Sequence, residues 1–384
     1  MQPASVPTTG YDLRAMSKRI ILFGPLPPPY GGVSIYLKSL VAHFRGANIR
    51  VWHYTGKATV PGMRFVAHRR LGTLSALLAE GRRSRILDTS HFHLEYPNAL
   101  LLPLWLIAKR LLHFEWYKNV LDGSLPARYA SFSRRQRWLF QRGLRAVDQF
   151  VVVSEDLKRW LQQELKVSQP ITVVPCLVPI PKSEVNARLS PETEEQVEVW
   201  ASRQKRVCSI GVFVPAYGFQ QVAEAVEELR RRTGKDIGLL LVDGGFALDD
   251  EYREVVLWDR DWITVVEEIP NNEVYEILRR SDVFFRGVEV ESYGISRVES
   301  LWCGTPVVAT RTGEMRGMLL YDFGDVDQLV AQLQAVLLYP TVQDPNPWAE
   351  QFRREAEENL QTIARLLGIE DFEEPWHAAA KGKR

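Results

Sequence analysis

Residues 283–310 read Val283-Phe-Phe-Arg-Gly-Val-Glu-Val-Glu-Ser-Tyr-Gly-Ile-Ser-Arg-Val-Glu-Ser-Leu-Trp-Cys-Gly-Thr-Pro-Val-Val-Ala-Thr310. The apolar run at 283–286 predicts a buried strand, 294–302 predicts a helix, and 306–310 predicts the next strand. Gly304 is typical of the residue that ends a helix. A strand, a helix and a second strand in this order form a right-handed parallel unit, so the stretch predicts a parallel α/β sheet.

The same alternation extends through the chain on both sides of this stretch. In the second half we predict further strands at 206–212, 237–242 and 262–266, and helices at 219–233, 272–280, 325–338 and 348–367. In the first half we predict a helix at 33–44 and strands at 19–24, 49–54, 86–88, 117–121 and 149–153. The pattern predicts two doubly wound, Rossmann-like α/β domains.

The predicted boundaries of these domains follow the pattern. The parts are a flexible lead-in (1–17), a first domain (18–180), a linker with some local helix (181–205), a second domain (206–345), a helix that crosses back to the first domain (346–375) and a tail (376–384). Two such domains place a cleft between the carboxyl ends of their sheets. Ligands bind at that position in folds of this kind.

The composition is that of an ordinary globular protein. Hydrophobic residues make up 46% and charged residues 25% of the 384 residues, which excludes a largely disordered chain, a collagen-like repeat and a disulfide-knotted module. The 3 cysteines have no Cys-x-x-Cys spacing, which indicates a reducing compartment and argues against a structural zinc. The first fifteen residues lack the apolar core of a signal peptide. We therefore expect a cytoplasmic protein.

The charge is divided unevenly between the two halves. Up to Ile180 the chain has 25 Lys and Arg against 10 Asp and Glu, a net +15, whereas the remainder has 23 against 37, a net −14. A basic first half suits phosphate or an anionic membrane surface. Attraction between the two halves remains an alternative explanation.

An apolar run at Ala99–Ala108 is too short to span a bilayer. Two interpretations stay open for it. One is a buried helix of the first domain. The other is a peripheral contact with the inner face of the membrane, assisted by nearby arginines, which are Arg82, Arg83, Arg85, Arg134, Arg135 and Arg137.

A candidate anion site lies where the helix at 294–302 begins. The N–H groups of its first turn, near Gly294 and Ile295, have no partners within the helix and suit a pyrophosphate. Glu291 precedes the helix and Glu299 lies inside it. Because carboxylates repel phosphate, we expect this pair to bind sugar hydroxyls instead. The alternative is that both acids flank the helix at the surface.

The stretch Glu291–Thr310 resembles the motif of two glutamates separated by seven residues in family-4 glycosyltransferases, which have the GT-B fold. The trailing Gly304-Thr-Pro-Val-Val-Ala309 fits that family too. Pro29-Tyr-Gly-Gly-Val33 is similar to its glycine loop, and Val151-Val-Val-Ser-Glu155 to its strand leading to a serine. The resemblance extends from about Lys18 to about Gly368.

The resemblance implies transfer of a sugar from a nucleotide-sugar donor with retention of the anomeric configuration. The donor would lie mainly in the second domain and the acceptor mainly in the first. Carried onto the matching positions, Glu291 contacts the donor sugar, Glu299 contacts the ribose, and the Gly294 and Ile295 amides hold the diphosphate. Ser292 and Tyr293 belong to the same donor-binding loop. Gly31 and Gly32 let backbone approach the donor phosphate, or form a plain tight turn.

The chain departs from the family at the leaving-group site. The family usually places an Arg and a Lys after the first strand of the second domain, where Val212 and Tyr217 stand here. Such cations stabilise a departing diphosphate. We expect a replacement among nearby arginines, with Arg286 and Arg297 as candidate catalytic residues and Arg311 and Arg316 as weaker candidates.

A second departure concerns a histidine that the family places in a loop of the first domain. The corresponding loop contains Leu121 or Asp122, depending on register. Asp122 is a candidate catalytic residue that accepts a hydrogen bond from a sugar hydroxyl or assists the acceptor proton. Alternatively, Asp122 and Gly123 form an ordinary turn.

We therefore expect a retaining glycosyltransferase with the GT-B fold that moves a sugar to a glycan or lipid-linked saccharide. We expect no bound cofactor, no metal site and no nucleic-acid partner, since no metal-ligand spacing is present. Two alternatives stay open, a non-catalytic scaffold protein of this fold and a nucleotide-sugar epimerase.

Overall fold

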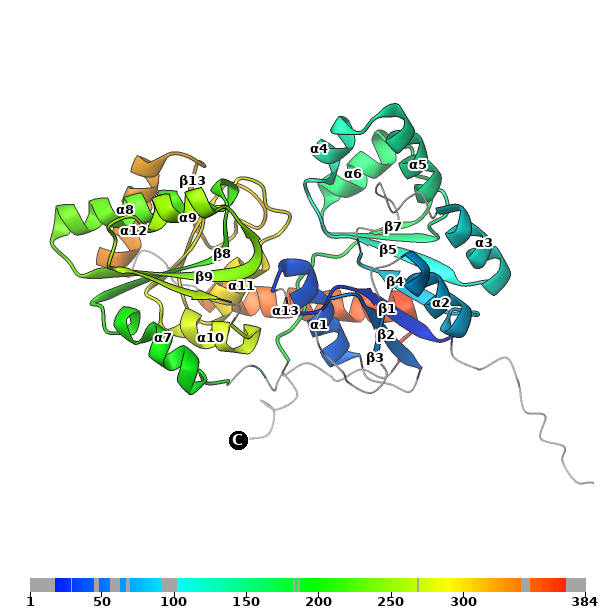
Figure 1. The fold of residues 1–384 in the computed structure, drawn as a ribbon, viewed down its shortest axis with the longest axis horizontal. Coiled ribbons are helices and arrows are strands. Elements are labelled where there is room, and N and C mark those ends of the chain that lie inside the picture. The colour runs from blue at the N-terminus through cyan, green and yellow to red at the C-terminus, as the bar shows by residue number, and fades with distance from the viewer. Residues whose placement is uncertain are drawn as a thin grey trace, which may run out of the picture.

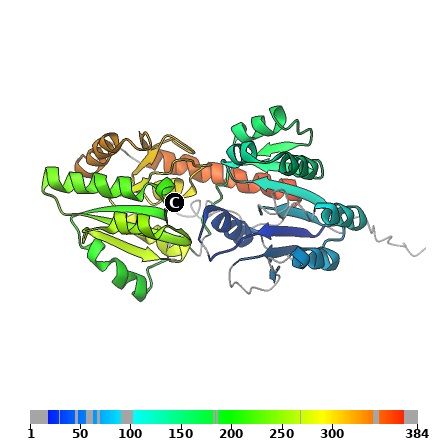
Figure 2. The same cartoon turned by 45° about the horizontal axis from the view of Figure 1, so that its top comes forward.

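The computed structural model describes residues 18–28, 30–44, 48–55, 63–66, 70–90, 102–181, 184, 187–267, 269–339 and 346–370. These residues form two α/β domains that lie side by side (Figures 1 and 2). The prediction of two doubly wound domains is confirmed. The predicted lead-in at 1–17 and tail at 376–384 lie outside the described residues.

Seven parallel strands form the sheet of the first domain, in the order β3-β2-β1-β4-β5-β6-β7. Their bounds are β1 (Ile20–Gly24), β2 (Ile49–His53), β3 (Met63–Phe65), β4 (Arg85–Asp88), β5 (Glu115–Val120), β6 (Gln149–Val152) and β7 (Ile171–Val173). Every residue of β1 is buried, as expected of a central parallel strand covered on both faces. The chain passes from β1 to β2 on one side and returns at β4 on the other. The switch point of this sheet therefore lies between β1 and β4.

Six parallel strands form the second sheet, in the order β10-β9-β8-β11-β12-β13. Their bounds are β8 (Lys205–Phe213), β9 (Ile237–Leu248), β10 (Ile263–Glu267), β11 (Val283–Arg286), β12 (Val307–Thr310) and β13 (Leu319–Tyr321). Here the switch point lies between β8 and β11. The loops that follow β8 and β11 therefore diverge at the carboxyl edge, which is where a ligand is expected.

Helices connect these strands in both domains. In the first domain they are α1 (Gly32–His43), α2 (Arg70–Glu80), α3 (Leu102–Leu112), α4 (Leu125–Ser131), α5 (Arg134–Leu144) and α6 (Glu155–Gln163). In the second they are α7 (Pro191–Ala201), the 3-10 turn η2 (Pro215–Tyr217), α8 (Phe219–Thr233), α9 (Asp250–Leu257), α10 (Asn271–Arg280), α11 (Ile295–Trp302) and α12 (Val326–Leu338).

Alternate residues of β9 show how both faces of the second sheet are covered. Leu239 and Leu241 belong to a core that also contains α8, α9 and α12. Leu240 and Val242 point the other way, into a core that contains α7, α10 and α11 (Figure 1). The period of two along a strand produces this division.

The predicted linker at 181–205 differs from the structure, because it contains a helix of the second domain. α7 begins after Ser190, whose hydroxyl accepts a hydrogen bond from the Thr193 N–H, and it packs on β9 and β10. Val197 and Trp200 on α7 are fully buried, and Trp200 Nε1 donates to Val207 O over 3.0 Å. The second domain therefore begins near Pro191.

The long helix α13 (Asn346–Leu367) links the two domains (Figures 1 and 2). It packs against α11 of the second domain. Further along, Asn359 Nδ2 donates to Leu177 O over 3.0 Å, and Leu366 O accepts from Arg85 Nη1 over 3.2 Å. The helix therefore extends from the second domain to the edge of the first.

The sequence pattern did not single out β3, β7, β13 or α9. The three strands have only three residues each, which is too short to display a period. They lie at or next to the ends of their sheets, where fewer side chains are buried. The sheets are consequently wider than the sequence predicts.

The apolar run at Ala99–Ala108 is described from Leu102 onward, within α3. This helix buries Trp105 and Ala108 against the first domain, and it exposes Leu104 and Ile107. The prediction of a helix that packs on the first domain is confirmed, and the membrane contact stays a prediction. No helix in the described part of the chain combines the length and apolar character that crossing a bilayer demands.

Candidate active site

A cavity of about 290 Å³ lies between the domains, at the carboxyl ends of both sheets. The first domain and the segment that follows β7 contribute Tyr30, Gly31, Gly32, Val33, Ile35, Leu121, Asp122 and Cys176. The second contributes Ile210, Gly211, Tyr217, Val242, Asp243, Gly244, Ile269, Asn271, Val274, Arg286, Glu291, Ser292, Tyr293, Gly294, Ile295, Ser296 and Glu299. Of the predicted site residues, all but Arg297 and the weaker candidates Arg311 and Arg316 line this cavity.

On the first-domain side, the cavity meets the start of α1. The Gly31 N–H donates to Ser34 Oγ over 3.0 Å, and Gly31 O accepts the first helical hydrogen bond from Ile35 N over 3.0 Å. A Cβ added at Gly32 would have no atom within 4 Å. Glycine is therefore not required here by crowding or by backbone conformation. The absence of a side chain at Gly32 leaves open space beside the first turn of α1.

On the second-domain side, the cavity meets the start of α11. Gly294 is the N-cap residue, with φ 88° in the left-handed region, and no side chain caps the helix. A Cβ at Gly294 would approach Arg297 Cδ to 2.8 Å. Glycine is thus required both by conformation and by packing. The first-turn N–H groups of α1 and of α11 border the same cavity from opposite domains, and each helix directs the positive end of its dipole there.

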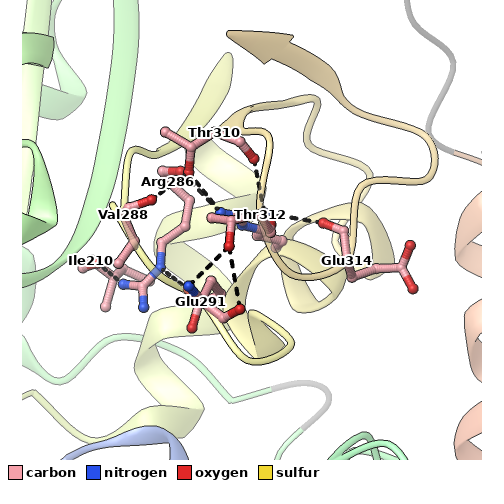
Figure 3. Close-up of polar contacts among 8 residues, drawn as sticks. Ile210, Arg286, Val288, Glu291, Thr310, Thr312 and Glu314 are labelled. Atoms are coloured by element: carbon pink, nitrogen blue, oxygen red, sulfur yellow. Dashed lines mark hydrogen bonds and ion pairs between the residues drawn. The ribbon is translucent and has the colours of Figure 1, made fainter. Parts of the chain in front are cut away.

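Glu291 is fixed in its loop by contacts on both sides. Its N–H donates to Thr312 Oγ1 over 3.1 Å, and its Oε2 accepts from Arg286 Nε over 2.9 Å. Figure 3 shows both contacts. The Glu291 side chain is 15% exposed, so the carboxylate faces the cavity and not the outer surface.

Glu299 lies deeper in the cavity wall and is 6% exposed. The Tyr275 hydroxyl donates to its Oε1 over 3.1 Å, and Asn271 Nδ2 donates to the same hydroxyl over 2.8 Å. Burial raises the pKa of Glu299 to about 7, although its hydrogen bonds with Tyr275 and Asn271 lower it. Neither glutamate is a solvated acid flanking the helix at the surface.

Arg286 is the last residue of β11 and lines the cavity. Figure 3 shows its side chain reaching toward Glu291 and Ile210. Besides its contact with Glu291, its Nη1 donates to Ile210 O over 2.6 Å, and its guanidinium carbon lies 5.1 Å from the centre of the Tyr217 ring. Burial lowers the pKa of Arg286, but the Glu291 carboxylate and the Tyr217 side chain outweigh it, so the pKa is raised. The group therefore stays charged.

The position of Arg297 differs from the prediction that it is a cation of the site. Its side chain is fully buried beneath the loop that follows β12, and it is not in the cavity wall. Its Nη1 donates to the carbonyls of Thr310, Thr312 and Glu314, and its Nη2 donates to Thr310 Oγ1 over 3.1 Å. Burial lowers its pKa to about 10. These bonds turn the guanidinium toward the protein interior, so Arg297 supports the loop and cannot grip a phosphate.

The weaker arginine candidates are also occupied elsewhere. Arg311 Nε pairs with Asp322 Oδ1 over 3.0 Å, and Arg316 pairs with Glu314 and with Glu355 of α13. Neither lines the cavity. Val212 is fully buried in the sheet, so of the two positions where the resemblance expects cations only Tyr217 faces the cavity.

Asp122 lines the cavity but has bonded partners. Its Oδ1 accepts from the Ser124 N–H over 2.8 Å and from the Ser124 hydroxyl over 2.7 Å, and its Oδ2 pairs with Arg128. The Leu125 N–H closes the turn on Asp122 O over 3.3 Å. This geometry favours the turn interpretation over a role in accepting the acceptor proton.

Ser292 and Tyr293 occupy the loop between the two glutamates in different ways. Ser292 Oγ accepts a hydrogen bond from the Gly123 N–H over 2.6 Å, which joins the two domains beside the cavity. Tyr293 is 6% exposed, and its carbonyl accepts from the Glu314 N–H over 2.8 Å. Ser292 thus connects the walls, and Tyr293 anchors the loop.

Sequence reasoning missed several polar residues of the cavity. Asp243 follows the apolar core of β9, and its Oδ1 accepts from the Gly245 N–H over 3.0 Å. Asn271 begins α10, and Tyr275 lies one turn later beside Glu299. Asp243 and Asn271 could have been found from the sequence, because each lies at or after the carboxyl end of a predicted strand, where ligands bind in this kind of sheet. Among the described residues no group of three His, Cys, Asp or Glu is placed to hold a metal ion.

Two family models match the chain. The model described as Glycosyltransferase Family 4 matches residues 30–180, and the model described as Glycosyl transferases group 1 matches residues 190–354. A curated protein of Mycolicibacterium smegmatis is 25% identical over 323 residues, which cover 77% of this chain and 80% of that protein. It is a GDP-mannose-dependent alpha-(1-6)-phosphatidylinositol monomannoside mannosyltransferase.

Solved structures share the fold at low identity. HepE of Anabaena in complex with UDP and glucose has a TM-score of 0.66 at 14% identity, covering 91% of this chain and 99% of its own. An alpha,alpha-trehalose-phosphate synthase of Burkholderia xenovorans in complex with glucose-6-phosphate has a TM-score of 0.69 at 12% identity, covering 91% and 100%. Sucrose-phosphate synthase of Thermosynechococcus elongatus has a TM-score of 0.64 at 16% identity, covering 92% and 97%.

Proposed function

The chain belongs to the family-4 glycosyltransferases of GT-B fold, and we propose that it moves a sugar, with retention of the anomeric configuration, from a nucleotide-sugar to a glycan or lipid-linked saccharide. One observation carries the proposal. The first turns of α1 and α11 border one interdomain cavity, together with Arg286 and the two glutamates. Such a site offers backbone donors to a diphosphate and carboxylate acceptors to hydroxyls.

The proposed roles follow from the position of each group. The diphosphate lies against the amides of Gly294 and Ile295, with Arg286 as its cation. Glu291 accepts hydrogen bonds from the donor-sugar hydroxyls, and Glu299 from the ribose. Gly31 and Gly32 admit the donor phosphate close to the α1 backbone, since a Cβ at Gly32 would meet no atom within 4 Å.

In the proposed transfer step, the leaving nucleoside diphosphate takes the acceptor proton, so no side chain has to act as a base. The bond between the anomeric carbon and the diphosphate oxygen breaks, the acceptor hydroxyl oxygen forms the new glycosidic bond, and its proton leaves on the nucleoside diphosphate. Among the described first-domain residues of the cavity, Asp122 is the only acid, and Ser124 and Arg128 hold its carboxylate. A leaving group that takes the proton must stay beside the acceptor, so attack comes from its own side and configuration is retained.

A donor panel tests the function. Purified protein is mixed with UDP-, GDP-, ADP- and dTDP-sugars, and thermal shift identifies the donors that bind the native state, since such ligands raise the apparent unfolding temperature. Turnover of each binding donor is then measured with and without saccharide acceptors, and proton NMR reads the anomeric configuration of the product. Retained product supports the proposal. Inverted product, a product formed without acceptor, or no turnover with any donor overturns it.

We propose that the acceptor is membrane-borne, because the first domain carries an amphipathic surface. Leu104, Ile107 and Leu111 of α3 are 44%, 55% and 70% exposed and follow helical spacing, and Leu78 of the neighbouring α2 is 64% exposed. Arg82, Arg83 and Arg110 are exposed nearby, and the Arg83 N–H donates to Leu112 O at the end of α3 over 2.8 Å. An apolar stripe edged by arginines suits the anionic inner face of a cell membrane.

Vesicle sedimentation tests this surface. The protein is expected to sediment with vesicles that contain phosphatidylglycerol and to stay in solution with phosphatidylcholine alone. Replacing Ile107 and Leu111 by Glu should abolish sedimentation. Val255→Glu, on the half-exposed Val255 of the second domain, is the matched control and should leave it unchanged. Sedimentation that is absent, or unaffected by the double change, contradicts the docking surface.

A further inference from the structure

The leaving-group site has a shortage of positive charge. Among the described residues that line the cavity, Arg286 is the single Lys, Arg or His, against the acids Asp122, Asp243, Glu291 and Glu299. A diphosphate that departs with its bonding electrons needs strong electrostatic stabilisation. Whatever holds Arg286 in place therefore matters more in this chain than in a site with several cations.

Three groups hold the Arg286 side chain, and one of them is Tyr217. The Ile210 carbonyl and the Glu291 carboxylate accept hydrogen bonds from Nη1 and Nε, while the guanidinium carbon lies 5.1 Å from the centre of the Tyr217 ring. A guanidinium has five N–H donors, so donors remain for phosphate oxygens. The Tyr217 ring contributes a cation–π attraction, and its hydroxyl adds a hydrogen bond, without adding a carboxylate to the site.

The turn that carries Tyr217 is built to reach Arg286. Gly218 has φ 67°, and a Cβ there would approach Gly287 O to 2.3 Å. A Cβ at Gly211 would approach Tyr217 Cδ1 to 2.5 Å, and the Glu289 N–H donates to Ala216 O over 3.0 Å. Two close glycine contacts and one hydrogen bond therefore pin η2, with its tyrosine, against the strand end that presents Arg286.

We infer that Tyr217 is a positioning residue that holds Arg286 against the leaving diphosphate, so that the pair performs the task of the missing cations. This inference rests on the proposed transfer from a nucleotide-sugar. Tyr217 touches the guanidinium and no reacting atom. The Tyr217 side chain holds the guanidinium through the cation–π contact and a hydrogen bond, and a guanidinium held in place can bind phosphate oxygens with two parallel hydrogen bonds.

A relocated cation tests the inference most sharply. Arg286→Ala should lower kcat by about 100- to 1,000-fold, the loss typical of one electrostatic group in an active site. Because position 217 adjoins the guanidinium, adding Tyr217→Arg to Arg286→Ala should restore at least about tenfold of that loss, through the same electrostatic stabilisation. Arg311→Ala is the matched control, since Arg311 pairs with Asp322 outside the cavity, and it should leave kcat unchanged.

The role of the ring is tested on the native arginine. Tyr217→Ala should lower kcat by about tenfold while the KM for the donor changes little, because positioning acts on transition-state stabilisation. Tyr217→Phe retains the ring but loses the hydroxyl that bonds Arg286, so its kcat should fall between those of the parent and Tyr217→Ala. Arg286→Lys retains charge without the planar fork and should fall between the parent and Arg286→Ala.

The outcomes separate this inference from the proposed function. Unfolding temperatures first establish that each variant is folded, and calorimetric binding of the nucleoside diphosphate product gives a readout independent of turnover. Weaker product binding in Arg286→Ala, recovered in the double variant, supports the inference even if no acceptor has been found. It is overturned if folded Arg286→Ala matches the parent, or if the folded double variant is no better than Arg286→Ala. Parent protein that binds no nucleotide-sugar overturns the proposed function instead.

Discussion

The first domain lines the cavity with backbone and small or apolar side chains, whereas the second lines it with charged groups. The first-domain wall consists of the start of α1, with Gly31 and Gly32, and one acid whose carboxylate is engaged. The second-domain wall carries Arg286, Glu291 and Glu299, each fixed by hydrogen bonds. The second domain therefore supplies the charged groups of the cavity, and the first supplies its open space. Each domain should therefore fail in its own way when it is altered.

Loss of charge in the second wall should have the largest effect. Glu291→Gln removes the negative charge that holds Arg286 and leaves one acceptor oxygen for the donor sugar in place of two, so we expect kcat to fall by about 100- to 1,000-fold. Steady-state kinetics measure it. Glu289→Gln, two residues earlier and exposed, is the control. An equal loss in both variants would show that acidic charge near the loop, and not this carboxylate, is what the reaction needs.

Arg297→Ala should damage the second wall through stability. Its removal leaves the carbonyls of Thr310, Thr312 and Glu314 without a buried donor, which costs about 3 kcal/mol of unfolding free energy. Urea denaturation measures this cost. A variant that unfolds like the parent but has lost turnover would return Arg297 to the catalytic role that its sequence position suggested.

Filling the first wall should impair binding without loss of stability. Gly32→Ala and Gly32→Leu place growing side chains where a Cβ meets no atom within 4 Å. We expect the donor KM to rise with side-chain size, by about tenfold for leucine, because the larger side chain displaces one or two contacts between the donor and the α1 backbone. Thermal unfolding should be unchanged for Ala. If KM stays constant in both variants, the donor does not approach the start of α1.

Glu299 should make stability and donor binding depend on pH in opposite directions. Its pKa in the folded protein is raised to about 7 from 4.5 by burial, so between these values the folded state binds more protons than the unfolded one. The free energy of unfolding therefore falls by about 3 kcal/mol as pH rises through this window. An ionised carboxylate accepts hydrogen bonds from ribose hydroxyls more strongly than a protonated one, so nucleoside diphosphate affinity should increase over the same window.

Calorimetric binding and urea denaturation at several pH values measure both trends. Glu299→Gln should flatten both curves, because its amide does not titrate. Parent curves that are already flat, or a pH dependence that persists in the variant, would assign the titration to another group.

The smallest effect is expected at the acid of the first wall. Asp122→Asn keeps an oxygen for the Ser124 donors, and so we expect less than about threefold loss in kcat. The measurement is a kcat profile over pH. A large loss with a shifted acidic limb would mean that Asp122 accepts the acceptor proton after all, and the two walls would share the chemistry.

The sequence predicted the parts of this molecule that repeat a simple period. β1 and β11 follow the predicted apolar runs, and the helix predicted at 294–302 is α11, Ile295–Trp302. The same reasoning placed Glu291 and Glu299 beside that helix. Three-residue strands and the attachment of α7 to the second sheet escaped it, because both depend on tertiary packing and not on local pattern.

Side-chain direction was the other limit. Sequence position places Arg286 and Arg297 equally near the cavity, but the structure turns one toward the ligand site and the other toward buried carbonyls. The decisive partners are loop residues 310–314, whose course no periodicity encodes. The partnership of Tyr217 with Arg286 was hidden for the same reason, since it arises where two strand ends converge.

The hydrogen bond from the Gly123 amide to the Ser292 hydroxyl has a consequence for how products escape. A neutral hydrogen bond contributes only about 1 kcal/mol net in water, which is little more than thermal energy. Breaking this single hydrogen bond opens the side of the cavity through which a nucleoside diphosphate product would leave. The contacts of α13 keep the two domains attached to each other meanwhile. The contact between Gly123 and Ser292 by itself therefore opposes separation of the two cavity walls only weakly.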